Sequence, residues 1–298
     1  MAAILRVAAT WHPLLRPPSF DEYYSRIPAA GKENEMPFIE INGAALRYDL
    51  SGAGEKTLVL IHEMGGTLES WDDVLPALAQ GRRVLRFDTR GAGLSEKLRG
   101  TGDIDVMADD VAGLLDAVGV TGKVAVAGIA VGGAIAIHFA ARYADRTAAL
   151  IPMSPAVGVA SERKAATAAA ADNLEMKGVR ATYDASAEAT YPSAMRTDTA
   201  RYERVRAQRL GNDPGSYAAI YRMLNSMDLS EDYAKITCPT LIIAGRYDGL
   251  RPPGMVTPLA ERIQGAKVEV LPTAHFMSQQ TPELVAETML RFLKDVGC

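Results

Sequence analysis

The chain has 298 residues, of which 48% are hydrophobic, and its formal net charge is −4. A chain of this length and composition can bury one large core, so we expect a single globular unit. The 32 basic residues are interspersed among 36 acidic ones without forming a basic stripe, which argues against nucleic acid as a partner.

The number of cysteines and the hydropathy further restrict the class of protein. Cys238 and Cys298 are too few for a disulfide framework, and they lack the spacing and histidine neighbours of a zinc site. No apolar run approaches the roughly 18 residues needed to span a bilayer. We therefore expect a soluble, cytoplasmic protein without a membrane partner. Regular alternation begins at Pro37, so residues 1–36 are expected to be a poorly ordered N-terminal extension.

The first part of the core combines a hairpin with alternating strands and helices. Asn42-Gly43, the dipeptide that best tolerates a tight hairpin, separates strand-like runs over 38–41 and 45–50. Later segments such as Asp105–Val118 and Val131–Tyr143 have helical periodicity. They alternate with four apolar strands expected over Thr57–His62, Arg83–Asp88, Lys123–Gly128 and Ala148–Met153. This alternation predicts an α/β fold with a mostly parallel sheet and helices on both faces.

A helical insertion is predicted over residues 154–233, where the alternation stops. The sheet resumes with Thr240–Gly245 and Val268–Leu271, and a last helix begins at Pro282. The core therefore comprises residues 37–153 and 234–298. Open α/β sheets bind ligands at the carboxyl ends of their strands, so the insertion is a candidate lid. Its arginines are interpreted as a solvated face, with recognition of an anionic substrate as the alternative.

A glycine-flanked turn, Gly128-Ile129-Ala130-Val131-Gly132, joins an apolar strand directly to an apolar helix. It is similar to the nucleophile elbow G-x-S-x-G, whose middle residue has a positive φ and whose glycines let strand and helix approach closely. Ala130 stands where the nucleophile is expected. Taken alone, the segment is equally compatible with an ordinary turn between a strand and a helix.

Two later residues complete the pattern of a catalytic triad. Asp248 follows the strand 240–245, and His275 follows the strand 268–271. Each residue alone could be a turn former or a packed side chain. The order of nucleophile position, acid and base is the order that this kind of fold uses. We therefore take Asp248 as the candidate acid and His275 as the candidate base.

An oxyanion hole needs two backbone donors, one from the elbow and one from the segment that follows the strand 57–62. The expected donors are the backbone N–H groups of Met64 and Val131, which do not depend on the side chain at position 130. His62 is predicted to contact substrate. Glu63 is expected either to support the site from behind or to face solvent, and direct contact with substrate is the alternative. Ser154, at the end of the sixth strand, is also a candidate for substrate contact, but no elbow presents it as a nucleophile.

Residues 37–298 resemble the α/β-hydrolase superfamily. The motif over residues 86–95, together with the Asp248 and His275 segments, is most similar to 3-oxoadipate enol-lactonases and small esterases. The resemblance implies an eight-stranded sheet, and it implies that Asp88, Arg90 and Ser95 brace a loop below the site. Ala130 departs from the family pattern and puts an acyl-enzyme mechanism in doubt.

Three functions remain open at this point. The first, which we favour, is a hydrolase in which the catalytic serine has been replaced and whose substrates are carboxylic esters, lactones or related acyl compounds. We favour it because the glycines of the turn, which cost stability, and the Asp–His pair are retained. The second is a serine-independent enzyme in which His275 acts as general base on water or on a substrate proton. The third is a ligand-binding protein without turnover. The expected partner is a small molecule, and a homodimer is left open. No phosphate loop, dinucleotide fingerprint or metal cluster is present in the sequence, so no cofactor is expected.

Overall fold

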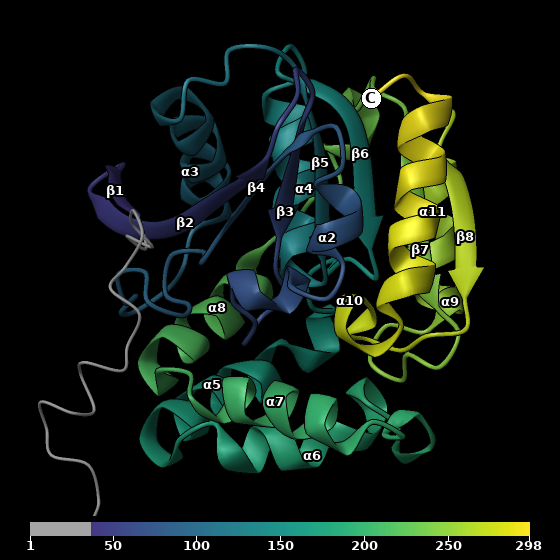
Figure 1. Ribbon diagram of the computed structural model, residues 1–298. Helices are drawn as coiled ribbons and strands as arrows, with labels where there is room; N and C mark the ends of the chain where they lie inside the picture. Colours follow the sequence, from purple (N-terminus) through teal and green to yellow (C-terminus); the bar gives the residue numbers. More distant parts are fainter. Residues whose placement is uncertain (1–36) are drawn as a thin grey trace, which may run out of the picture. The chain divides into compact units, whose positions relative to one another are not determined.

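An eight-stranded sheet forms the centre of the computed structural model, which describes residues 37–298 (Figure 1). The strands β1 and β2 pair antiparallel, as do β2 and β4, and all other neighbours are parallel. In spatial order the strands are β1 (Phe38–Ile41), β2 (Ala44–Gly52), β4 (Arg83–Phe87), β3 (Thr57–Ile61), β5 (Val124–Ile129), β6 (Thr147–Met153), β7 (Leu241–Gly245) and β8 (Lys267–Leu271). The predicted mostly parallel sheet is confirmed. The prediction for residues 1–36 lies outside the described residues.

The hairpin at the sheet edge follows from its turn residues. Asn42 and Gly43 have φ values of 51° and 72°, and Ile41 pairs with Ala44 across the turn. Two consecutive positive φ values give the turn a twist that matches the twist of the flanking strands. The Asn-Gly signal therefore places β1 and β2 correctly.

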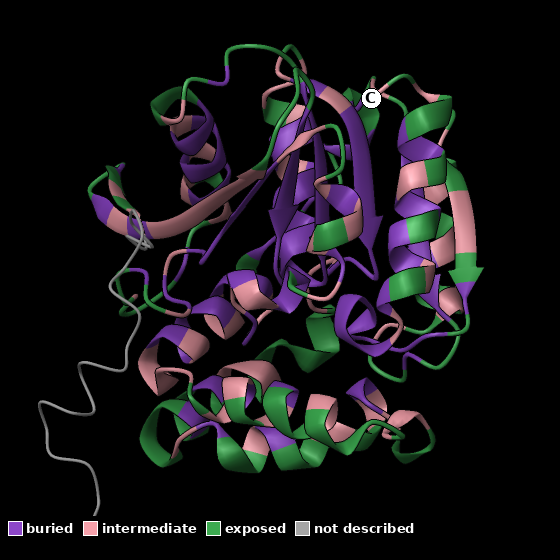
Figure 2. Ribbon diagram, in the orientation of Figure 1, coloured by how far each residue is buried: buried purple, intermediate pink, exposed green. Residues whose placement is uncertain are grey.

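Helices cover both faces of the sheet, as predicted. In β3 every residue is buried because Val59 and Ile61 pack into one apolar cluster while Leu58 and Leu60 pack into the other. The first cluster is covered by α3 (Ile104–Ala117) and α4 (Val131–Arg142), and the second by α2 (Leu75–Leu78) and α11 (Pro282–Asp295). Figure 2 shows the buried strands between these helices. A continuous apolar strand is what burial on both faces requires.

Four longer helices lie between β6 and β7 in the sequence, within the predicted insertion. They are α5 (Lys164–Lys177), α6 (Arg180–Thr190), α7 (Thr199–Leu210) and α8 (Pro214–Ser226). Figure 1 shows them as a layer at the end of the sheet toward which the arrows of the parallel strands point. The short helices are η1 (Leu68–Trp71), η2 (Ser161–Arg163), η3 (Ser193–Met195), η4 (Tyr233–Lys235), α9 (Pro253–Val256), η5 (Thr257–Arg262) and α10 (Met277–Gln280). Within residues 37–298, no helix combines the length and hydropathy needed to cross a membrane.

Candidate active site

Ala130 occupies a strained turn between β5 and α4. Its φ is 51° and its ψ is −112°, a conformation that costs a residue with a Cβ on the order of 1–3 kcal/mol. Backbone hydrogen bonds hold the turn: the N–H of Ala130 donates to the carbonyl of Met153 at 2.9 Å, and the N–H of Ala156 donates to the carbonyl of Ala130 at 2.8 Å. The surrounding strands therefore impose the strain, and the Ala130 side chain lines a cavity.

Both glycines of the turn are required by close backbone contacts. A Cβ at Gly128 would lie 2.2 Å from the carbonyl oxygen of Gly132, and a Cβ at Gly132 would lie 2.2 Å from that of Ile61. No side chain fits either space. The start of α4 therefore packs directly on β3 and β5, which is the close approach that the glycine spacing predicts.

Asp248 and His275 are hydrogen-bonded in the interior. Asp248 Oδ2 lies 2.8 Å from His275 Nδ1, and both residues are buried. Asp248 Oδ1 accepts the backbone N–H groups of Leu250 and Arg251 at 2.9 and 2.8 Å. A carboxylate can only accept, so Nδ1 carries the proton, and a neutral imidazole keeps its lone pair on Nε2.

The electrostatics of this pair favour an ionised acid. Burial raises the pKa of the Asp248 carboxyl, but its hydrogen bonds with His275 and with the backbone N–H of Arg251 outweigh it and bring the pKa below its usual value. Asp248 is therefore a carboxylate at neutral pH, able to orient the imidazole and stabilise its protonated form.

The candidate oxyanion donors line the same cavity as Ala130 and His275. This cavity has a volume of about 90 Å³, and Met64 and Val131 contribute to its wall. Neither the N–H of Met64 nor that of Val131 donates a hydrogen bond to a group within residues 37–298. Two unpaired amide donors beside the elbow could bind a developing oxyanion.

Comparison with known proteins places this geometry in a family. The sequence profile of the serine aminopeptidase S33 family matches residues 52–277, which is most of the chain. The chain belongs to this family of α/β-hydrolases. Within the part of the α/β-hydrolase that the structure describes, no group of three His, Cys, Asp or Glu side chains could hold a metal ion.

Individual relatives of this α/β-hydrolase support the predicted branch. It is 31% identical over 265 residues to a protein assigned as a carbamate hydrolase, RutD, from Azorhizobium caulinodans, covering 88% of this chain and 99% of that protein. A solved esterase from Thermogutta terrifontis is similar, with a TM-score of 0.82, 27% identity, and coverage of 87% of this chain and 99% of the esterase. The enol-lactonase from Burkholderia xenovorans gives a TM-score of 0.80 at 27% identity, covering 87% and 100% of the two chains. The predicted similarity to esterases and enol-lactonases is confirmed.

His62 does not contact the cavity around Ala130. Its Nε2 accepts the backbone N–H of Thr89 at 2.9 Å, and its Nδ1 lies 2.8 Å from the carbonyl oxygen of Glu63. Both ring nitrogens are therefore committed to the backbone, with the proton on Nδ1. The ring of His62 therefore holds the backbone of Glu63 and Thr89, and its contact with substrate stays a prediction.

Glu63 is buried rather than exposed to solvent, so that alternative was wrong. Its Oε1 is paired with Nη2 of Arg209 from α7 and accepts the hydroxyl of Ser70 at 3.1 Å. Burial raises the pKa of Glu63, but the charge and the hydrogen bond of Arg209 outweigh it, and the pKa lies below its usual value. Arg209 lines the cavity and Glu63 does not, so Glu63 takes the supporting position behind Arg209.

Ser154 lies behind the cavity. It follows β6 with a φ of 40°, its N–H donates to the carbonyl of Ile243 at 2.8 Å, and it is fully buried. Its side chain is not part of the cavity wall. The structure therefore places Ser154 outside the cavity wall, although Ala156 lines it, and contact of Ser154 with substrate stays a prediction.

Arg209 is the functional candidate that the sequence interpretation placed wrongly. It was assigned to a solvated face with the other arginines of the insertion, yet it is only 2% exposed. The available signal was its spacing from Val205, since residues four apart lie on one face of a helix and Val205 is buried. The buried partner, Glu63, lies 146 residues earlier and could not be identified from that spacing.

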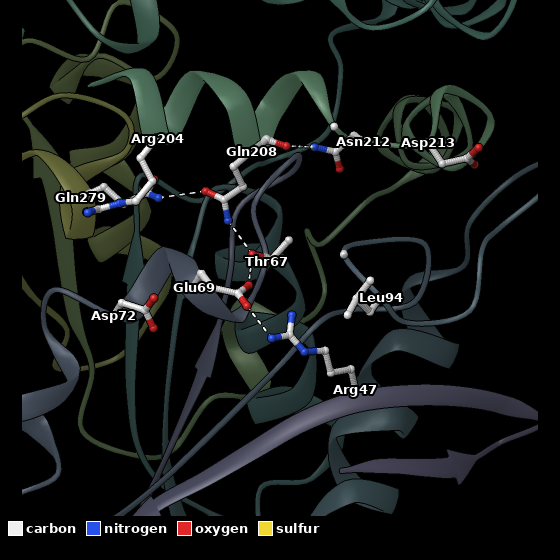
Figure 3. Close-up of a pocket in the computed structure, with 12 residues that line it drawn as sticks. Arg47, Thr67, Glu69, Asp72, Leu94, Arg204, Gln208, Asn212, Asp213 and Gln279 are labelled. Atoms are coloured by element: carbon white, nitrogen blue, oxygen red, sulfur yellow. Dashed lines mark hydrogen bonds and ion pairs between the residues drawn. The ribbon is translucent and has the colours of Figure 1, made fainter. Parts of the chain in front are cut away.

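A larger groove of about 380 Å³ lies beyond Gln208 and Gln279 (Figure 3). Gln279 Nε2 donates to Gln208 Oε1 at 3.0 Å, and the Gln208 amide donates to the hydroxyl of Thr67. Neither Ala130 nor His275 lines this groove. Despite its volume, it lacks the groups that acyl transfer needs.

Proposed function

We propose that this α/β-hydrolase is built to hydrolyse carboxylic esters, lactones or related acyl compounds such as carbamates, and that Ala130 replaces its nucleophile. The observation that supports this proposal is the meeting of Ala130, His275 and two unpaired backbone N–H groups at one small cavity. The names of the relatives agree with acyl chemistry of this kind.

With a serine at position 130, each group has a defined role. The serine oxygen attacks the carbonyl carbon while His275 Nε2 takes its proton, and Asp248 stabilises the resulting imidazolium. The N–H groups of Met64 and Val131 stabilise the oxyanion, and His275 then protonates the leaving group. Water hydrolyses the acyl-enzyme by the same steps. The alanine lacks the oxygen that forms the covalent bond, so the present chain cannot follow this route.

The helices of the insertion act as a lid in this proposal. Tyr183 of α6, Arg209 of α7 and Tyr217 of α8 line the cavity together with Ala130 and His275. Such a layer excludes water and shapes the space for the substrate.

A second candidate is supported by the intact Asp248–His275 pair. Because Nδ1 is bonded to the carboxylate, Nε2 can accept a proton from water or from an acidic substrate. This enzyme would need no nucleophile at position 130.

The Ala130→Ser variant tests the two candidates. We expect hydrolysis of p-nitrophenyl acetate, a γ-lactone or a phenyl carbamate to rise by a factor on the order of 10³ or more. His275→Ala in the serine background should remove the gain. Equal turnover of the two forms, with folding intact by circular dichroism, would reject the replaced-serine hydrolase. If the unmodified chain, with Ala130, turns over substrate and His275→Ala abolishes that turnover, the result would support the second candidate.

A further inference from the structure

Several hydrogen-bond donors at the lid side of the cavity have no acceptor. Arg209 Nη2 donates to Glu63 and, at 3.2 Å, to Gln279 Oε1. Its Nε and Nη1 have no partner within residues 37–298, and neither has the hydroxyl of Tyr183. Both side chains line the cavity and are buried. Buried donors without acceptors are rare because leaving them unpaired is unfavourable, so their concentration here indicates a bound acceptor.

The guanidinium of Arg209 is held in place from the other directions. The Phe276 ring lies under it, with Cζ 3.9 Å from the ring centroid. Gln279 is itself bonded to Gln208, and Figure 3 shows this amide pair at the wall of the outer groove. Arg209 therefore cannot turn away to satisfy its free N–H groups elsewhere.

A second arginine lines the same cavity. Arg251 follows the candidate acid, and its side-chain hydrogen bond within the described residues goes to the sulfur of Met255 at 3.8 Å. Between residues 37 and 298, no carboxylate lies within 4.0 Å of its guanidinium nitrogens. The cavity thus adjoins a cation that has no close ion-pair partner in this part of the chain.

We propose that Arg209, with Tyr183 and Arg251, binds a carboxylate of the substrate and makes the site selective for small anionic acyl compounds. A carboxylate has only acceptors, and its planar shape fits the N–H groups of a guanidinium. A small cavity of about 90 Å³ suits a short compound. Half esters of short dicarboxylic acids have this chemistry. The acyl part of this inference rests on the proposed function, whereas the carboxylate site does not.

Binding to the unmodified chain tests the carboxylate site without turnover. Isothermal titration calorimetry would compare monomethyl succinate, which is an anion, with dimethyl succinate and methyl butanoate, which are neutral. We expect the anion to bind about tenfold more tightly or better, as hydrogen bonds to a charged group allow. Equal or tighter binding of the neutral esters would overturn the proposal.

Variants test which residues cause the preference for the anionic ester. Arg209→Gln should bring the ratio of the two affinities close to one. The double variant Glu63→Gln with Arg209→Gln should also bring the ratio close to one. It leaves no unpaired buried charge, so it replaces the single variant in this test if that variant fails to fold. Tyr183→Phe removes one donor and should lower the ratio severalfold. The control is Arg206→Gln on the same helix, because Arg206 pairs with Glu203 outside the cavity. A ratio that persists without Arg209, or that Arg206→Gln removes equally, would refute the assignment.

The two proposals can fail separately. Charge-selective binding without any gain in turnover from Ala130→Ser would reject the hydrolase and keep the carboxylate site. Hydrolysis by that variant with no preference for anionic esters would reject the carboxylate site and keep the hydrolase.

Discussion

Replacing Gly132 with alanine tests whether the close packing of α4 on β3 shapes the elbow. The added Cβ would lie 2.2 Å from the carbonyl oxygen of Ile61 and 2.4 Å from that of His62. Ordinary contacts of a Cβ begin at 3.4 Å, so the helix and the strand would have to separate by about 1 Å. Backbone oxygens cannot rotate away as the end of a side chain can.

The expected cost lies at the upper end of the range for overpacking, about 3 kcal/mol. For a domain of this size, each kcal/mol lowers Tm by about 2–4 °C, so Tm should fall on the order of 10 °C. The shift would also move the N–H of Val131. In the Ala130→Ser background, we therefore expect activity to fall by a factor on the order of 10², because a displacement of this size disrupts catalytic geometry.

Thermal unfolding followed by circular dichroism would measure the effect. Gly122→Ala is the matched control, because nothing lies within 4 Å of the Cβ that it adds and Gly122 does not have a positive φ. That variant should keep the Tm of the parent or raise it slightly. A Gly132→Ala protein as stable as the Gly122→Ala protein would show that the contact with β3 does not constrain the elbow.

Two further predictions concern the buried acids. In the Ala130→Ser background, Asp248→Asn should lower kcat by about 10⁴, because an amide can donate to His275 Nδ1 and hold the wrong tautomer; an unchanged kcat would contradict the role of the pair. The folded-state pKa values of Glu63 and Asp248 lie below their usual values of 4.5 and 3.8, so both carboxylates stabilise the fold above those values. That stabilisation should be lost as pH falls below about 4 through the folded pKa values, which urea unfolding at pH 7, 5, 4 and 3 would measure. Glu63→Gln should cost about 3–5 kcal/mol at pH 7, because it leaves Arg209 buried without a counter-charge. The same variant should also lose less of its stability as the pH falls. Glu287→Gln, at an exposed position, should change neither the stability at pH 7 nor its dependence on pH.

The sequence by itself determined the elements whose signals are local. The Asn42-Gly43 turn, the continuous apolar residues of β3 and the start of α11 at Pro282 all appear where the residues predict them. The spacing of Gly128 and Gly132 also indicated a close approach that the structure contains. These features depend on the φ preferences and hydrophobic periodicity of a few neighbouring residues, which can be recognised without knowing the rest of the fold.

Only the tertiary structure decided the partners of the polar residues. A charged side chain is buried only where a partner compensates it, and Arg209 meets Glu63 across 146 residues of sequence. His62 is similarly committed to the backbone of Thr89, 27 residues away, rather than to the cavity. Such pairings depend on which distant segments the sheet order brings together. Charge and spacing in the sequence are compatible with many partners, and packing selects one.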